Sequence, residues 1–137
     1  MDWRIEAIDK LKCYRVKKAS VKGLEEEIQE LEEELASIRK APASKAQEGE
    51  ILDNLTQQEA LKRSMALTRQ WLKRVNRGLA ALGEDDRRLL HCFFMQKEKG
   101  GLDQLCQELD IDKDAAYSRR DSALRYFTMA LYGVAEV

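Results

Sequence analysis

The chain has 137 residues, of which 36% are charged and 44% apolar, and its formal net charge is −1. With one proline and seven glycines, this composition is typical of long helices and argues against both a disordered chain and an all-β chain. No run of about 18 apolar residues and no basic end followed by an apolar block occurs, so we expect neither a membrane span nor a secretory signal.

A first long helix is predicted over residues 2–40. Its apolar residues recur at alternating spacings of three and four, as in a coiled-coil seam. These residues are Val21, Leu24, Ile28, Leu31, Leu35 and Ile38. Residues 1–22 hold seven Lys or Arg against three acids, whereas residues 23–35 hold seven Glu and no base. The segment 41–49, which contains Pro42, Ser44 and Gly49, is predicted to be a connecting loop.

A second long helix is predicted over residues 50–82, with Gly83 as its C-terminal cap. Its seam comprises Leu61, Met65, Thr68, Leu72, Val75, Leu79 and Leu82. Neither helix can bury its apolar stripe alone. We therefore expect residues 1–82 to form a long antiparallel, coiled-coil-like helical hairpin, or to associate with other copies of the chain into a homo-oligomer.

Pairing in such a hairpin can be estimated. With the turn near Lys45, residue 31 lies opposite about residue 60, so the acidic block 25–34 would face a nearly neutral stretch. The basic blocks 4–22 and 62–77 would meet at the open end, where their repulsion favours a polyanion or an acidic partner. An alternative interpretation, with equal weight, is that these basic blocks are only the solvated faces of two amphipathic helices. The auxiliary basic surface of the second helix consists of Lys62, Arg63, Arg69, Lys73, Arg74 and Arg77.

The pattern of residues 83–137 predicts a separate unit of three helices. The first begins at Glu84–Asp86 and presents Leu89, Leu90, Phe93 and Phe94; a turn ends at Gly100–Gly101. A helix over 102–109, a tight turn at 110–112 and a last helix over 113–131 follow. Two helices joined in this way form the helix-turn-helix pattern.

The residues of that turn meet its physical demands. Cys106 and Ala116 are small enough for the two helices to cross closely. Asp110 tolerates left-handed backbone, Ile111 supplies an apolar anchor, and Asp112 is a suitable N-cap.

The last helix and the residues after it carry a motif that comprises Tyr117, Arg119, Arg120, Asp121, Ala123, Leu124, Phe127 and Leu131-Tyr132-Gly133. With this motif, the segment from Leu82 to Gly133 resembles the fourth region of sigma-70-type factors, which reads the −35 promoter element. The whole chain is similar to small phage and prophage proteins of Gram-positive bacteria of the ArpU/RinA type, which regulate late transcription. This resemblance implies a sequence-specific transcriptional regulator that places helix 113–131 in the major groove, with double-stranded DNA and RNA polymerase as partners.

The same alignment assigns candidate DNA contacts. Base contacts are expected from Lys113, Asp114, Tyr117 and Ser118, and phosphate contacts from Arg120 and Arg125. Arg119 stands where sigma regions hold an apolar residue, so it either pairs with an acid, which we favour, or bends outward. Arg87 and Arg88 either bind phosphate or pair with Glu84 or Asp85.

Other functions are less well supported. The single histidine, His91, has no fixed partner acid, and no phosphate-binding glycine loop or metal-ligand spacing occurs, so neither an enzyme nor a cofactor is expected. Cys13, Cys92 and Cys106 form no CxxC pair and indicate free thiols in a cytoplasmic protein. Because residues 84–137 hold eight bases against eleven acids, this unit alone should bind DNA weakly. Two alternatives follow, a sigma-like adaptor that binds RNA polymerase or another protein, and a small terminase-like DNA-packaging protein.

Overall fold

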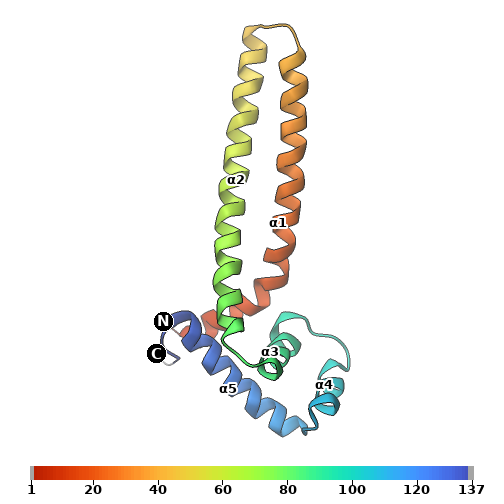
Figure 1. Ribbon diagram of the computed structural model, residues 1–137, viewed down its shortest axis with the longest axis vertical. Helices are drawn as coiled ribbons and strands as arrows, with labels where there is room; N and C mark the ends of the chain where they lie inside the picture. Colours follow the sequence, from red (N-terminus) through yellow and green to blue (C-terminus); the bar gives the residue numbers. More distant parts are fainter. Residues whose placement is uncertain (1, 136–137) are drawn as a thin grey trace. The chain divides into compact units, whose positions relative to one another are not determined.

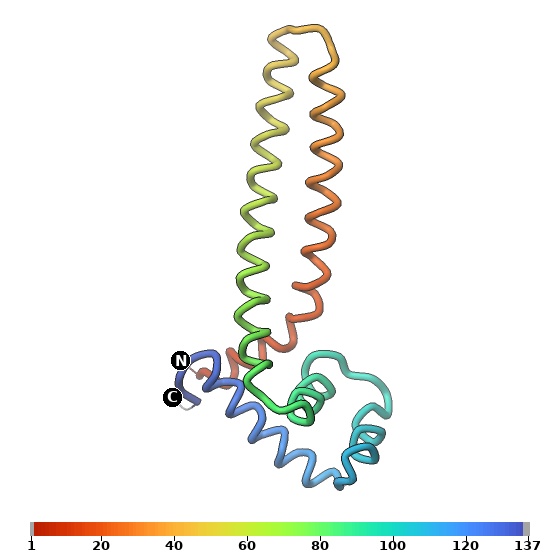
Figure 2. Tube along the Cα trace, in the orientation of Figure 1, coloured from red at the N-terminus to blue at the C-terminus, as the bar shows by residue number. Residues whose placement is uncertain are grey.

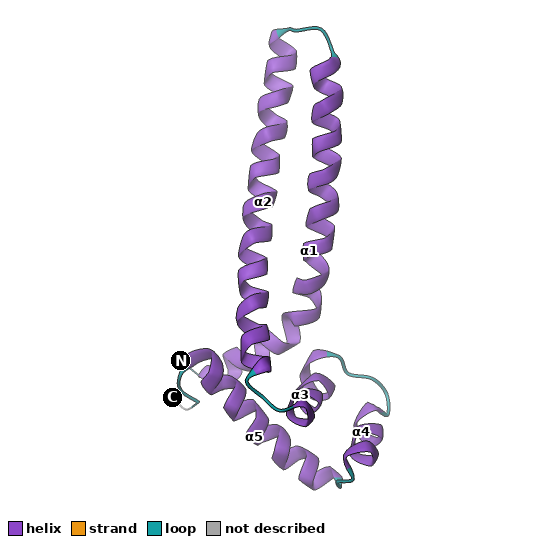
Figure 3. Ribbon diagram, in the orientation of Figure 1, coloured by secondary structure: helices purple, strands orange, loops and turns teal. Residues whose placement is uncertain are grey.

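The computed structural model describes residues 2–135, and within this range the chain is all-helical (Figure 3). Its elements are α1 (Trp3–Lys40), α2 (Lys45–Ala80), α3 (Glu84–Leu90), a π-helical turn η1 (His91–Met95), α4 (Gly101–Leu109) and α5 (Lys113–Tyr132) (Figure 1). The all-α class is confirmed. Residues 1, 136 and 137, at the outer ends of the two expected domains, lie outside the described range. No described helix is both long and apolar enough to cross a membrane.

The chain divides into two compact units, and α1 and α2 contribute to both. Unit 1 comprises Met1–Val16 and Leu72–Val137, and unit 2 comprises Lys17–Trp71. The domain boundary expected at 82/83 therefore lies inside unit 1. The physical reason is that the first turns of α1 and the last turns of α2 pack with α5, as described below.

The connection between α1 and α2 is shorter than expected, because α2 begins at Lys45 and the expected loop 41–49 shrinks to residues 41–44. Ser44 acts as an N-cap, since its hydroxyl accepts from the backbone N–H of Gln47 at 3.0 Å. The Gln47 amide in turn donates to the carbonyls of Ile38 and Ala41 at the end of α1; the carbonyl of Ile38 also accepts from the N–H of Ala41. These hydrogen bonds offset the cost of Gly49, since a glycine inside a helix is about 1 kcal/mol less favourable than alanine.

In unit 2 the two helices run antiparallel, side by side (Figure 1). From α1, Ile28 and Leu35 are buried. From α2, the buried residues are the amides Asn54 and Gln58, which are only 4% and 5% exposed. Asn54 donates to the carbonyl of Leu31 at 3.0 Å and accepts from Gln58 at 2.7 Å. Buried amides in a helix seam favour one register, because any other register leaves them unpaired.

The acidic block of α1 does not face a neutral stretch, and that expectation is wrong. Arg69 pairs with Glu25, and the Lys62 ammonium lies 3.7 Å from the Glu32 carboxylate. Long side chains on both helices reach along the partner helix, so a pairing estimated from Cα positions alone misses these contacts. Arg63 pairs with Glu59 one turn earlier on α2.

In unit 1, α5 packs against the end of α2 and the start of α1. Gly78 of α2 has no side chain, and the fully buried ring of Phe127 occupies the space beside it. At the other edge, the rings of Trp3 and Tyr132 lie 4.6 Å apart, so the first turn of α1 lies beside the last turn of α5 (Figure 2). The long helices thus supply part of the surface on which α5 is seated.

We predict that Gly78→Ala is less stable than a matched Gly23→Ala variant by about 1–3 kcal/mol, the usual cost of overpacking. A Cβ at position 78 would lie 2.9 Å from Phe127 Cε1, whereas nothing lies within 4 Å of a Cβ at position 23. Gly23→Ala should itself be neutral or stabilising, since alanine favours helix. Urea unfolding measures both, and equal free energies of unfolding would contradict the proposed close contact.

Candidate nucleic-acid interface

A small apolar core joins α3, α4 and α5. Its buried members are Leu89, Leu105, Cys106 and Ala116, and Cys92, Phe93, Leu102, Leu109 and Ile111 pack around them. The small side chains at positions 106 and 116 lie where α4 and α5 approach each other, as expected from the sequence. The core fixes the N-terminal half of α5 against the other two helices.

The turn between α4 and α5 has the expected geometry. Asp110 is left-handed, with φ 53° and ψ 50°, and is the only non-glycine residue with positive φ in residues 2–135. The N–H of Ile111 donates to the carbonyl of Cys106 at 3.1 Å. Asp112 caps α5 by accepting from the N–H of Ala115 at 2.7 Å. Three adjacent residues thus end α4, reverse the chain and start α5.

The end of the third predicted helix differs from a regular α-helix. After Leu90 the backbone forms the π-helical turn η1, which closes with a hydrogen bond from the N–H of Gln96 to the carbonyl of His91 at 2.9 Å. A π turn inserts an extra residue and rotates the side chains that follow it. Here Phe93 meets Tyr117 of α5, with ring centroids 5.4 Å apart.

The four candidate base-contacting residues, Lys113, Asp114, Tyr117 and Ser118, are all exposed on the first two turns of α5. Lys113 is paired with Asp103 of α4, with 3.0 Å between the ammonium and the carboxylate. The hydrogen bond from this side chain to Asp103, followed by the charge of Asp103, raises the pKa of Lys113. Lys113 therefore stays charged, but part of its charge is already balanced.

Arg120 is held in place by more contacts than an arginine that is free to bind a phosphate. Its guanidinium lies 4.9 Å from the Phe93 ring centroid and 5.0 Å from that of Tyr117. It also donates to the Asp121 carboxylate at 2.9 Å, and the same oxygen accepts from Arg4 at 3.1 Å. Its side chain is only 25% exposed. Arg120 therefore orients Tyr117 at least as much as it offers a charge to a ligand.

The other candidate arginines of α3 and α5 differ in their surroundings. Arg119 lies 3.5 Å from Asp86 and 3.9 Å from Asp85, which confirms the favoured ion pair. Arg88 pairs with Glu108 of α4 instead of the expected acids of its own helix. Arg87 is exposed and forms no ion pair with another described residue. Arg125 is exposed as well.

The auxiliary basic surface does not act as one group. Lys62, Arg63 and Arg69 belong to unit 2, where each pairs with a glutamate. In unit 1, Arg74 donates to the carbonyl of Leu131 at 3.1 Å, and its guanidinium lies 5.2 Å from the Tyr132 ring centroid.

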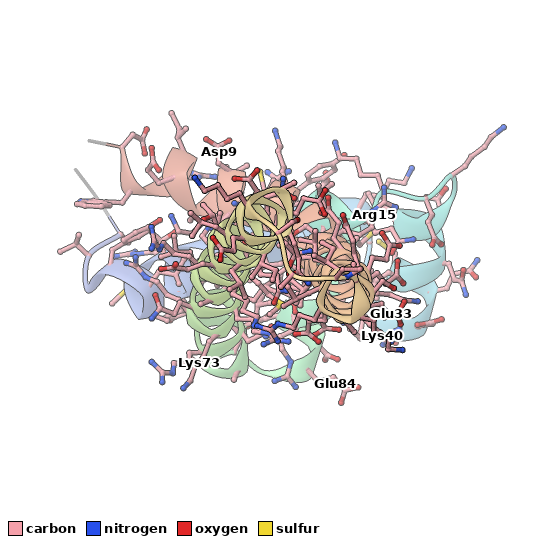
Figure 4. The ribbon with its side chains drawn as sticks, turned by 90° about the horizontal axis from the view of Figure 1, so that it is seen from above. Asp9, Arg15, Glu33, Lys40, Lys73 and Glu84 are labelled. Atoms are coloured by element: carbon pink, nitrogen blue, oxygen red, sulfur yellow. The ribbon has the colours of Figure 1, made fainter. Side chains whose placement is uncertain are left out.

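Two members of that surface keep their charge available. Lys73 and Arg77 are exposed and form no ion pair within residues 2–135, and the Lys73 side chain extends away from α2 (Figure 4). Unit 1 holds fifteen Lys or Arg against fourteen acids. Unit 1 therefore has a net charge of +1, whereas residues 84–137 considered alone are net acidic, because the ends of α1 and α2 add basic residues.

A cavity of about 450 Å³ lies between α3, η1 and α4, with Cys92, Met95 and Leu105 among its lining residues. Burial, followed by the nearby Cys106 and Glu98, raises the pKa of Cys92, so its thiol stays protonated at neutral pH. No group of three His, Cys, Asp or Glu in the described part of the chain is arranged to hold a metal ion.

No protein-family model, curated protein or solved structure matches the chain.

We predict that Asp110→Gly unfolds with at least the wild-type free energy, whereas Asp110→Ala is less stable than Asp110→Gly by about 1–2 kcal/mol. The left-handed backbone at this position costs a Cβ-bearing residue roughly that amount, and glycine avoids it. Urea denaturation of the two variants gives the difference directly. If both had the same stability, the left-handed conformation at the turn would be refuted.

Proposed function

We propose that the chain is a sequence-specific, double-stranded-DNA-binding transcriptional regulator, in which α4, the turn 110–112 and α5 act as a helix-turn-helix. One observation carries the proposal. The first two turns of α5 follow a tight, capped turn and present Lys113, Asp114, Tyr117 and Ser118 on their exposed surface. The opposite side of the helix is buried at Ala116 and Ala123.

This surface fits the chemistry of a major groove. A groove about 12 Å wide admits one α-helix, and the 20 residues of α5 span about 30 Å. The N-terminus of α5 carries the positive end of the helix dipole; Asp112 accepts from the N–H of Ala115 there, and the other N–H groups of the first turn can face a phosphate. Lys113 and Ser118 can contact a base or a phosphate, Asp114 can accept from a cytosine amine, and Tyr117 offers a ring and a hydroxyl.

Phosphate contacts come from fewer residues than the sequence indicates. Of the candidate cations in unit 1, Arg87, Lys73 and Arg77 are exposed and form no ion pair with another described residue. The three candidate cations that lie in unit 2, Lys62, Arg63 and Arg69, already balance glutamates. Because phosphate neutralisation supplies much of the non-specific affinity, we infer that non-specific binding is weak. The affinity then depends on the base contacts of α5 and on assembly.

The resemblance to sigma region 4 and to phage late-transcription regulators supports the same proposal. In it, the helices of residues 1–82 form a coiled-coil-like hairpin that serves homo-oligomerisation, and α5 is the recognition helix. Two copies would read two half-sites one helical turn of DNA apart, or a multiple of that. Selection of bound sequences from random duplex DNA would supply the binding site used in the experiments below.

We predict that Tyr117→Ala reduces affinity for the selected duplex about tenfold, whereas Tyr126→Ala on the same helix changes it less than about threefold, since one good base contact contributes roughly 1–3 kcal/mol. Both tyrosines are exposed, but Tyr126 lies more than two turns further along α5. Fluorescence anisotropy measures both, after urea unfolding shows that each variant folds. Equal losses would argue against the N-terminal half of α5 as the reading surface.

We also predict that Lys73→Glu combined with Arg77→Glu weakens binding of any duplex and reduces the slope of log affinity against log salt by about two, one for each phosphate that is no longer neutralised. Lys62→Glu combined with Arg63→Glu makes the same change in net charge at residues that are already paired. This control should leave the slope nearly unchanged. If both double variants shifted it equally, only the overall charge would matter.

A second candidate is a sigma-like adaptor that acts mainly by binding RNA polymerase. It is favoured by the number of unit 1 cations that already have acidic partners, including Lys113, Arg88 and Arg119. Capture of RNA polymerase from lysate by the immobilised chain, together with duplex affinity no greater than that of a scrambled sequence, would support the adaptor over the DNA reader.

A further inference from the structure

One side of unit 2 carries a groove formed by two adjoining hollows of about 390 and 410 Å³. The hollows share Leu31, Glu34 and Gln57, so they form one continuous feature between α1 and α2. Its apolar lining consists of Leu31, Ile38, Ala60 and Leu61. Unlike the buried Ile28 and Leu35, Leu31, Ile38 and Leu61 are only half-buried and Ala60 is exposed, because two helices alone cannot cover their seam from the side.

The polar lining of this groove is strongly acidic. Both helices contribute carboxylates, namely Glu27, Glu30 and Glu34 from α1 and Glu50 and Asp53 from α2. Among the described residues, no Lys or Arg lines either hollow. The groove therefore combines an apolar floor with walls of one sign of charge.

The other side of the same helix pair is different. At about 100° per residue, Glu25 and Glu32 lie on the opposite side of the α1 seam from Glu27 and Glu34. Those first two glutamates pair with Arg69 and Lys62 of α2. The helix pair thus neutralises carboxylates on one side, whereas those of the groove form no ion pair with any residue of the described range 2–135, although nearby like charges cost free energy.

We propose that this groove binds a basic amphipathic helix of another protein, as the third helix of a bundle. The apolar face of that helix would cover Leu31, Ile38 and Leu61, and its flanking Lys and Arg would meet the carboxylate walls. This is the helix-in-groove mode of recognition, with charge complementarity setting the choice of partner. The proposal is independent of DNA binding by unit 1.

Other occupants fit the groove less well. A nucleic acid would be repelled by five carboxylates. No described group of acids is arranged to hold a metal ion. A second copy of the chain would have to supply one of its two basic stretches, and both are engaged within the chain. At the start of α1, Ala7 and Leu11 are completely buried in unit 1, and on α2 the basic side chains of Lys62, Arg63 and Arg69 are paired with glutamates.

The test compares two charge-reversal pairs on α1 of the full chain. Glu27→Lys with Glu34→Lys alters the groove. Glu26→Lys with Glu33→Lys makes the same charge change at the same seven-residue spacing, at exposed positions outside the groove lining. The Glu33 side chain lies on the side of α1 away from α2 (Figure 4). Urea unfolding shows that both variants fold.

The probe is selected by display from a library of helical peptides that have leucines at helical spacing and random flanking residues. We expect the enriched peptides to carry a net positive charge. By fluorescence anisotropy, a synthetic enriched peptide should lose about tenfold in affinity for the groove variant, because each reversal replaces an attraction between opposite charges by a repulsion between like charges, and a tenfold loss corresponds to about 1.4 kcal/mol. The control variant should stay within about threefold, and duplex DNA affinity should be the same for both.

Three results would overturn the proposal. Enrichment of no peptide, or of neutral or acidic ones, would show that the groove does not select basic helices. Equal losses in the two variants would show that only net charge matters. If light scattering showed an oligomer that the groove variant alone dissociates, a second copy of the chain would be the occupant.

Discussion

The contact between Phe127 and the bare backbone at Gly78 is the constraint on which unit 1 depends. Phe127 is completely buried, and the Cβ of any other residue at position 78 would lie within 3 Å of its ring. The contact seats the C-terminal half of α5, while the core around Leu89 and Cys106 seats its N-terminal half. A helix held at both ends has little freedom to tilt. Recognition of a surface by its first two turns requires that rigidity, because a small misplacement of side chains weakens binding.

Charge pairing decides which cations of this chain can act on a ligand. The sequence holds nearly equal numbers of bases and acids, and the fold places many of them in contact. Arg69, Lys62 and Arg119 are each matched with acids from another helix. Such exposed pairs contribute little to stability individually. Their main effect is on binding. They neutralise some basic residues and leave others, such as Lys73, available to a ligand.

The sequence predicts the parts of the fold that depend on local chemistry. The left-handed Asp110 and the N-cap Asp112 are predictable because their conformational preferences act within two or three residues. The start of α2 is not, because Ser44 and Gly49 are both common in loops, although Ser44 here is a cap. The buried Asn54 escapes prediction altogether, because an amide in an apolar seam is recognised only once its partner on the other helix is known.

Tertiary contacts also give a structural role to residues that the sequence motif predicts to be DNA ligands. Arg120 is expected at the rim, yet it stacks on Tyr117 and shares the Asp121 carboxylate with Arg4 from the first turn of α1. Exposed pairs of this kind contribute about 1 kcal/mol or less, so the network does little for folding. Its effect is geometric: one oxygen of Asp121 fixes two guanidinium groups, and one of these fixes the ring that faces outward. The orientation of Tyr117 on α5 therefore depends on Arg4, more than a hundred positions earlier in the chain. The residue pattern of α5 alone could not have predicted that dependence.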